Sequence, residues 1–303
     1  MRITQHMMVE NLRSIINTSG EKLTDLQDQL ASGKRLRRPS DDPQDVNKAL
    51  KLKATSQQND QYLRNISNAK SWLEDTDSAL DQLSNVLIRA RDVAVRGSSD
   101  TLGQSERDQL ATQVDSMLAE ALQDANADHQ DQYLFAGRRV KLTGGSLPFE
   151  VTGSSLSYNG DTSGYLKLEI EKNTSPLSIS ILGATASTGT GTLGDALNAL
   201  ISLRDGLQSG SISTISAQLT QISTSLDDVA DLRGQVGAKV SRLDETETAL
   251  NSAQTRVASL LSRAQDTDVA DVMTKLTMQE NVYRTSLAAG ARVIQQSLLD
   301  FLK

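Results

Sequence analysis

The sequence predicts a mainly α-helical protein: an elongated antiparallel helical bundle or coiled coil with a small β-rich inserted domain. Apolar residues recur at alternating spacings of three and four towards both ends of the 303-residue chain, which is typical of coiled-coil packing. The four prolines leave residues 44–147 and 177–303 free of proline, and ten of the 19 glycines fall between Gly137 and Gly194. Because Gly and Pro interrupt regular structure, we expect two helical arms around a turn-rich insert.

The first arm is expected to hold three helices. An apolar series runs through residues 9–30, and Gly33 follows as the residue that ends the helix. A second series covers residues 62–94 and stops near Gly97. A third helix is expected to begin around Ser105, with a weak capping box in its first turn.

The longest apolar series lies in the return arm and predicts a helix over residues 212–264. Its apolar series is interrupted by three polar residues, Arg233, Glu247 and Gln254. A last helical segment follows, for which Asp266 and Asp268 are candidate caps.

The insert has the alternating pattern of short strands. Residues 156–158 and 165–170 are expected to pair as a hairpin across a glycine-containing loop, and residues 177–181 alternate as well. We therefore divide the chain into an N-terminal assembly helix and turn (1–44), the first part of a helical rod (45–137), a β-rich insert (138–191), the return part of the rod (192–265) and a C-terminal assembly helix (266–303).

Composition excludes several kinds of chemistry. The chain has no cysteine, which removes disulfides, thiolate metal sites and cysteine nucleophiles. The only histidines, His6 and His129, are not spaced as a zinc pair and are interpreted as surface polar residues. The G-x-G-x-x-G at residues 189–194 lacks the βαβ context of a dinucleotide site and is interpreted as a flexible linker. We predict no catalytic residue, no cofactor and no metal.

Charge and hydropathy restrict the partners. The formal charge of −7 argues against nucleic-acid binding, and no apolar run approaches the length that would insert into a membrane. The first residues also lack the apolar core of a cleavable signal peptide, so the protein is expected to stay in the cytosol or to leave by a route that reads no such signal.

The basic cluster at residues 34–38 precedes Asp41, Asp42 and Asp45, which favours local pairing of these charges. Pro43 suits the first position of a helix, with Asp42 before it as the cap.

The terminal segments, 5–32 and 269–302, can pair as antiparallel helices, but such a pair buries only one stripe of each helix. The remaining apolar faces call for partners, most simply further copies of this chain, which in head-to-tail contact form a ring or a helical tube. The candidate assembly interface comprises Leu12, Ile16, Leu23, Leu26, Leu30, Leu276, Tyr283, Leu287, Ile294, Leu298 and Phe301.

Four segments resemble the flagellin superfamily. Residues 31–43 are similar to its Ser-Gly-Lys-Arg…Pro-Ser-Asp-Asp-Pro turn, and Pro39 is typical of the hook-associated branch. Residues 132–137 resemble a Gln-Tyr-Leu-Phe-Ala-Gly segment of that branch, although Asp131 stands where the family often has Gly; residues 232–238 and 297–302 match as well. The family turn motif comprises Pro39, Ser40, Asp41, Asp42 and Pro43.

This resemblance implies a non-enzymatic structural subunit of the bacterial flagellum that joins hook to filament. It implies export through the flagellar type III channel, escorted by a chaperone on the C-terminal segment, and assembly outside the cell with itself, a neighbouring hook-associated protein and flagellin. One alternative is a flagellin-like filament subunit, which would differ in copy number. Another is a cytoplasmic signalling coiled coil, which leaves the insert and both end motifs unexplained.

Overall fold

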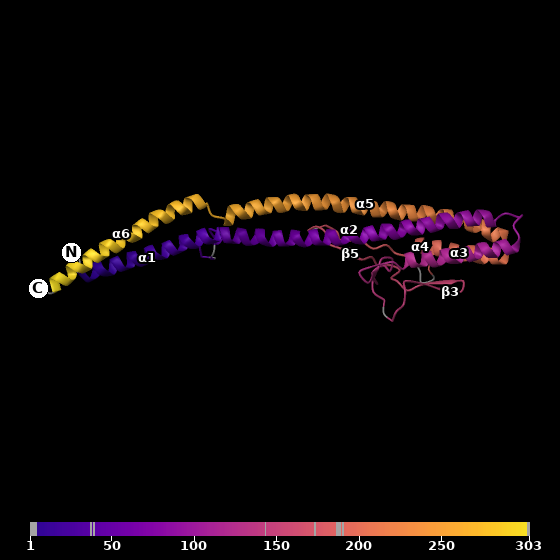
Figure 1. Cartoon of the computed structure of the whole chain (residues 1–303), viewed down its shortest axis with the longest axis horizontal. Coiled ribbons are helices and arrows are strands. Elements are labelled where there is room, and N and C mark those ends of the chain that lie inside the picture. Colours follow the sequence, from indigo (N-terminus) through magenta and orange to yellow (C-terminus); the bar gives the residue numbers. More distant parts are fainter. Residues whose placement is uncertain are drawn as a thin grey trace. The chain divides into compact units, whose positions relative to one another are not determined.

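A computed structural model describes residues 5–36, 38, 40–142, 144–172, 174–185, 189 and 191–301, and confirms a mainly helical chain (Figure 1). The helices of the described residues are α1 (Gln5–Ser32), α2 (Pro43–Gly97), α3 (Gln104–Ala125), α4 (Thr192–Ser209), α5 (Ile212–Gln265) and α6 (Val269–Phe301). The short strands are β1 (Asp128–His129), β2 (Gln132–Tyr133), β3 (Phe149–Thr152), β4 (Ser155–Tyr158), β5 (Lys167–Leu168) and β6 (Leu177–Ser178). Among the described residues, every helix is too short or too polar to cross a lipid bilayer.

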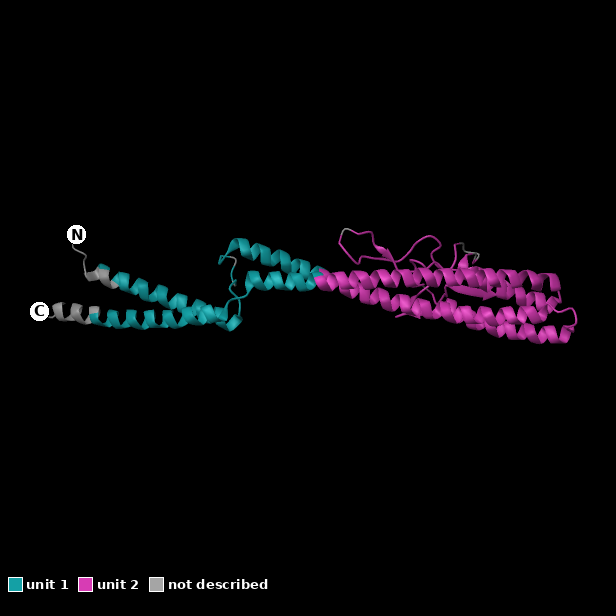
Figure 2. Cartoon of the chain, turned by 90° about the horizontal axis from the view of Figure 1, so that it is seen from above, with its two compact units in different colours: residues 1–58, 253–303 teal, residues 59–252 magenta. Residues whose placement is uncertain are grey.

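The chain forms two compact units, shown in different colours in Figure 2. Unit 1 contains residues 1–58 and 253–303, and unit 2 contains residues 59–252. Each unit therefore combines segments from both arms, because α2 and α5 contribute to both.

Unit 2 holds the hydrophobic core. Its part of α2 buries Leu73, Leu80 and Leu87, which are seven residues apart and lie in the predicted apolar series. The core continues through α3, α4 and α5 and extends under the strands. The helical pattern of this part of the sequence is therefore confirmed.

The polar residues in the apolar series of α5 are paired with α2. In unit 2, Arg233 Nε lies 2.9 Å from Asp77 Oδ1, and Lys70 contacts Glu247. In unit 1, Gln254 Nε2 donates a hydrogen bond of 2.8 Å to Ser56 Oγ. Polar groups within a coiled-coil seam favour one register at some cost in stability, so these contacts help to fix α5 on α2.

Helix ends agree with the sequence in one case and differ in another. Gly33 has a φ of 66° and its N–H donates to Gln29 O, which ends α1 as predicted. The capping box expected at Ser105 is wrong, because α3 begins after Gly103 without a side-chain cap. The Asp108 carboxylate accepts a hydrogen bond from the Gln104 side chain.

The strand pairing of the insert also differs from the predicted hairpin. The three two-stranded sheets of the described residues are antiparallel, but β4 pairs with β3, and β5 pairs with β6. The segment between β4 and β5 does not close a tight hairpin, since Asp161 Oδ1 accepts from the N–H groups of Ser163 and Gly164, and Tyr158 Oη donates to Phe135 O at 2.7 Å. Side-chain hydrogen bonds therefore turn this loop back onto the Phe135 segment.

The β1–β2 hairpin has no counterpart in the sequence prediction. Its two loop residues, Gln130 and Asp131, have φ values of 52° and 61°. A two-residue loop with both residues in the left-handed region matches a type I′ turn, which favours Asn-Gly. The hairpin also corrects the interpretation of His129, whose Nδ1 lies 2.5 Å from Asp75 Oδ2 and whose ring packs edge-on against buried Trp72.

We expect Asp131→Gly to stabilise unit 2 by about 0.5–1 kcal/mol, because glycine removes the Cβ that disfavours a positive φ. Trp72 is the only tryptophan and is buried in unit 2, so its fluorescence during urea unfolding measures the change. Asp131→Ala is the control, because it keeps the Cβ and should not stabilise. Equal midpoints for the two variants would contradict this account of the turn.

A buried carboxyl group near the end of α3 makes unit 2 sensitive to pH. Asp124 is 9% exposed, and its Oδ2 has no hydrogen-bond partner among the described residues. Burial, aided by the nearby Glu120 charge, raises the pKa of Asp124 to about 6 from 3.8. Because the folded pKa is the higher one, Asp124 lowers the free energy of unfolding as pH rises from about 4 through 6.

Asp124→Asn should therefore stabilise unit 2 by about 1 kcal/mol at pH 7.5 and have little effect near pH 4. Urea unfolding at both pH values, followed by Trp72 fluorescence, checks this. The exposed Asp100→Asn serves as control. A stabilisation of equal size at both pH values would show that ionisation of Asp124 is not its cause.

The glycines at residues 189–194 are packed, which corrects the interpretation as a flexible linker. A Cβ added at Gly191 would lie 2.8 Å from the backbone nitrogen of Thr185. The Gly194 N–H donates to Gly183 O at 3.2 Å. Gly189 and Gly191 precede α4 and Gly194 lies in its first turn, and together they allow the chain to pass closely beside residues 183–185.

Candidate assembly surface

Unit 1 has almost no core of its own. Its buried residues, within the described part, are Ser19, Leu36, Val272 and Gly290. In contrast, it carries most of the large apolar side chains that are exposed among the described residues: Met7, Ile15, Leu50, Leu260, Val269, Met273, Met278, Val282 and Leu287. Exposed apolar residues concentrated on one part of a protein mark an interaction surface.

Helices α1 and α6 lie side by side in antiparallel orientation, as the terminal segments were expected to do (Figure 1). Gln279 Nε2 on α6 donates hydrogen bonds to Ser19 Oγ at 2.8 Å and to Ser19 O at 3.2 Å. A Cβ added at Gly20 would lie 3.6 Å from the Tyr283 ring, and one added at Gly290 would lie 2.8 Å from Leu12 Cδ2. The two helices thus approach closely at small residues.

The structure places the predicted interface residues in two environments. On α1, the five predicted residues are all half-buried: Leu12, Ile16, Leu23, Leu26 and Leu30. On α6, Leu276 and Tyr283 are half-buried, whereas Leu287 is 44% exposed. Ile294, Leu298 and Phe301 belong to α6, but their side chains, like that of His6, lie outside the described residues.

The face of α6 that covers α1 is identified by burial. It comprises Val272, Leu276, Gln279, Tyr283, Ser286 and Gly290, at spacings of four and three. At about 100° per residue, Val269, Met273 and Leu287 lie along one side of this face, and Met278 and Val282 along the other. We call these two sets the apolar flanks of α6. The sequence analysis identified only Leu287 among these flank residues. It assigned only apolar residues to the helix pair, and so it did not expect Gln279 on the face that covers α1.

The break between α1 and α2 lies beside the break between α5 and α6. Arg35 N donates to Gln265 O at 2.7 Å, and Thr267 N donates to Gly33 O at 3.0 Å. The Arg35 guanidinium bonds Asp45 Oδ2 at 2.6 Å, and this bond lowers the pKa of the Asp45 carboxyl. Local pairing of the basic cluster is therefore confirmed for Arg35.

The turn motif caps its helix. Asp42 Oδ1 accepts from the N–H groups of Gln44 and Asp45 at 3.0 and 3.1 Å, and Pro43 is the first residue of α2, as predicted. Asp41 Oδ2 accepts from Arg38 N at 2.7 Å, and Ser40 is exposed. Pro39 lies outside the described residues.

The same capping chemistry starts α6. Asp268 Oδ1 accepts from the N–H groups of Ala270 and Asp271 at 2.9 and 3.3 Å, which confirms Asp268 as a cap. Asp266 instead forms a backbone bridge with Lys34. Both helices that follow a break are therefore started by an aspartate.

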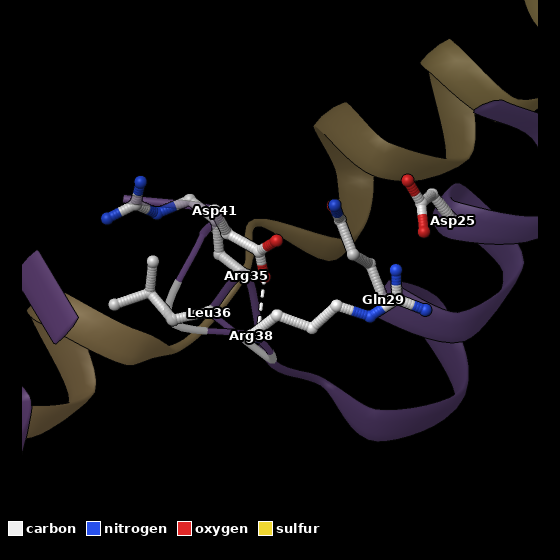
Figure 3. Close-up of a pocket in the computed structure, with 6 residues that line it drawn as sticks. All are labelled: Asp25, Gln29, Arg35, Leu36, Arg38 and Asp41. Atoms are coloured by element: carbon white, nitrogen blue, oxygen red, sulfur yellow. Dashed lines mark hydrogen bonds between the residues drawn. The ribbon is translucent and has the colours of Figure 1, made fainter. Parts of the chain in front are cut away.

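A polar cavity of about 200 Å³ lies at the turn (Figure 3). It is lined by Asp25, Gln29, Arg35, Leu36, Arg38 and Asp41. Figure 3 shows the Arg38 side chain reaching along α1 towards Gln29, while the Arg35 guanidinium points away from it. The described residues hold no group of three His, Asp or Glu side chains that could bind a metal ion.

Comparison with known proteins identifies the family. Residues 3–139 match the bacterial flagellin N-terminal helical region, and residues 219–302 match the bacterial flagellin C-terminal helical region. The chain therefore belongs to the flagellin family, and it is a structural protein of the flagellum rather than an enzyme.

Particular members of the family resemble the whole chain. Flagellar hook-associated protein 3 of Escherichia coli K12 is 25% identical over 99% of both chains. A flagellin of Listeria monocytogenes is 24% identical, over 95% of this chain and 94% of the flagellin. The structure of the flagellar junction protein FlgL from Legionella pneumophila superposes with a TM-score of 0.52, at 14% identity, over 72% of this chain and all of that one, and so supports the fold.

Proposed function

We propose that this protein forms the junction between hook and filament, and that its copies associate through the α1–α6 pair. The observation that carries the proposal is the environment of α6: one face covers α1, while both apolar flanks remain in contact with solvent. A helix with apolar residues on three sides is suited to contact neighbours on either side. Five flank side chains are 44–69% exposed, and burying each would contribute about 1 kcal/mol.

The assembly segments in this proposal are residues 1–44 and 266–303. Residues 45–137 and 192–265 form the rod, and residues 138–191 form the insert, which takes no part in the contact. The partners are further copies of the chain in a ring or helical tier, a neighbouring hook-associated protein on one side and flagellin on the other. Before assembly, an export chaperone would cover the apolar flanks of α6 while the chain travels through the flagellar export apparatus.

Electron microscopy of flagella labelled with gold-conjugated antibody against residues 138–191 tests the location. We expect a single band of label at the hook end of each filament. Deletion of the gene should leave hooks without filaments while flagellin is still released into the medium. Label along the entire filament would instead support the flagellin-like alternative, which the Listeria relative keeps open.

A further inference from the structure

The rotation of α6 about its own axis is unexpected for a helix that pairs by hydrophobic burial alone. The face turned towards α1 includes Gln279, Ser286 and Gly290, while the valines, methionines and leucine of the flanks face solvent. A rotation of about 60° would bring Leu287 and Val269 towards α1. That second setting would bury Leu287 and Val269 but would also turn Glu280 towards α1, so apolar area alone does not set the rotation and another interaction must contribute.

One such interaction is a hydrogen-bonded polar pair inside the seam. Ser19 is 5% exposed, and its hydroxyl and carbonyl oxygens both accept from the amide of Gln279. If α6 rotated, the buried Ser19 hydroxyl would lose this partner. An unpaired buried polar group costs about 1–3 kcal/mol. The same logic applies in coiled coils where one polar residue selects a register or orientation.

The other interaction is steric. Gly290 is buried, and Leu12 and Ile16 occupy the space beside it: a Cβ there would lie 2.8 Å from Leu12 Cδ2 and 3.5 Å from Ile16 Cδ1. After a rotation of about 60°, Leu287 would approach α1 and carry a side chain towards the space that Leu12 and Ile16 now fill. The notch at Gly290 and the pair at Ser19 therefore favour the same setting independently.

We infer that Ser19, Gln279 and Gly290 act as positioning residues that set the rotation of α6 on α1 and so keep both apolar flanks facing outward. The role of these three residues in assembly rests on the proposed function. The rotation of α6, in contrast, can be measured on a single chain. Without these residues, α6 could rotate and bury the flank that contains Val269 and Leu287 against α1, which would withdraw that flank from neighbouring copies.

Thiol labelling of the soluble full-length chain tests the rotation. The natural chain has no cysteine, so Ser286→Cys and Leu287→Cys each provide one reactive group, the first on the covered face and the second on an exposed flank. We expect the Ser286→Cys thiol to react several-fold more slowly with a maleimide. In a Ser19→Ala/Gln279→Ala background, which removes the hydrogen bonds without adding a large apolar side chain to the seam, this difference should disappear while circular dichroism shows unchanged helix content.

The matched control is Ser56→Ala/Gln254→Ala, which removes an amide–hydroxyl hydrogen bond of the same length from another helix pair of unit 1. It should preserve the difference between the two thiols. Gly290→Ala provides a second variant, which should reduce the difference by filling the notch without adding an unpaired polar group. Equal reactivity of the two thiols in the parent chain, or an unchanged difference in both the Ser19→Ala/Gln279→Ala background and Gly290→Ala, would overturn the inference.

The same variants, made both as purified protein and in the bacterium, separate the positioning role from the proposed junction function. If the parent chain shows the expected labelling difference but is absent from the junction, the proposed function fails and the positioning role stands. If the chain marks the junction but both Ser19→Ala/Gln279→Ala and Gly290→Ala label like the parent, the positioning role fails and the proposed function stands.

Discussion

Leu287→Asp should abolish incorporation into the flagellum while leaving the soluble chain as stable as the parent. Leu287 is 44% exposed on a flank of α6, so a carboxylate there remains hydrated in the monomer. Substitutions at such positions usually change the free energy of unfolding by less than about 0.5 kcal/mol. In an assembly that covers the flank, the charge would be buried without a partner, at a cost of several kcal/mol. Swimming assays and the amount of protein in purified flagella measure the loss.

Leu287→Met is the control, because it retains an apolar side chain and should assemble. Leu26→Asp provides the contrasting case. Leu26 is half-buried on α1 in a groove shared with Met278 and Gln279, so this change should loosen the α1–α6 pair in the soluble chain as well. Unit 2 should remain folded, as judged by Trp72 fluorescence. Normal motility of the Leu287→Asp strain would refute assembly through this flank.

The helices could be predicted from the sequence because each buries a regular stripe. The two ends of α5 were predicted to within a residue, and the α2 core follows the expected apolar series. The capping roles of Asp42 and Asp268 were also predictable, since capping depends on residues next to one another in the chain. Helix caps and the regular spacing of apolar residues are therefore the features that a single sequence reveals best.

The pairing of short strands could not be predicted, because it depends on long-range hydrogen bonds. Tyr158 ends β4 in contact with the carbonyl of Phe135, 23 residues earlier, and that contact directs the chain away from the expected hairpin. Two-residue strands also carry too little alternation to reveal their partners.

The surface of α6 was only partly predictable for a related reason. Its apolar residues occupy several faces, so periodicity does not decide which face covers α1. The deciding contacts are a polar pair, Ser19 with Gln279, and a close approach at Gly290. When a helix–helix contact is identified from apolar residues alone, Ser19, Gln279 and Gly290 look like interruptions of the apolar series.

Gly137→Ala should strongly destabilise unit 2, because the Gln-Tyr-Leu-Phe-Ala-Gly segment anchors the insert at this point. Gly137 has a φ of 65°, and a Cβ there would lie 2.7 Å from Asp161 O and 2.8 Å from Gly164 O. Backbone oxygens cannot move aside as a flexible side chain can. The loop at residues 161–164 would have to shift, and the hydrogen bond from Asp161 N to Ala136 O, now 3.0 Å, would be lost.

Gly153→Ala separates crowding from backbone strain. Gly153 has nearly the same φ, 64°, but a Cβ there would meet nothing within 4 Å. The left-handed conformation alone costs a residue with a Cβ about 1–2 kcal/mol, and this cost should be the entire effect of Gly153→Ala. Gly137→Ala should cost at least about 2 kcal/mol more, comparable to overpacking a core. Urea unfolding followed by Trp72 fluorescence gives both values. Equal losses would mean that the insert can move away from Gly137, and that this segment is not its anchor.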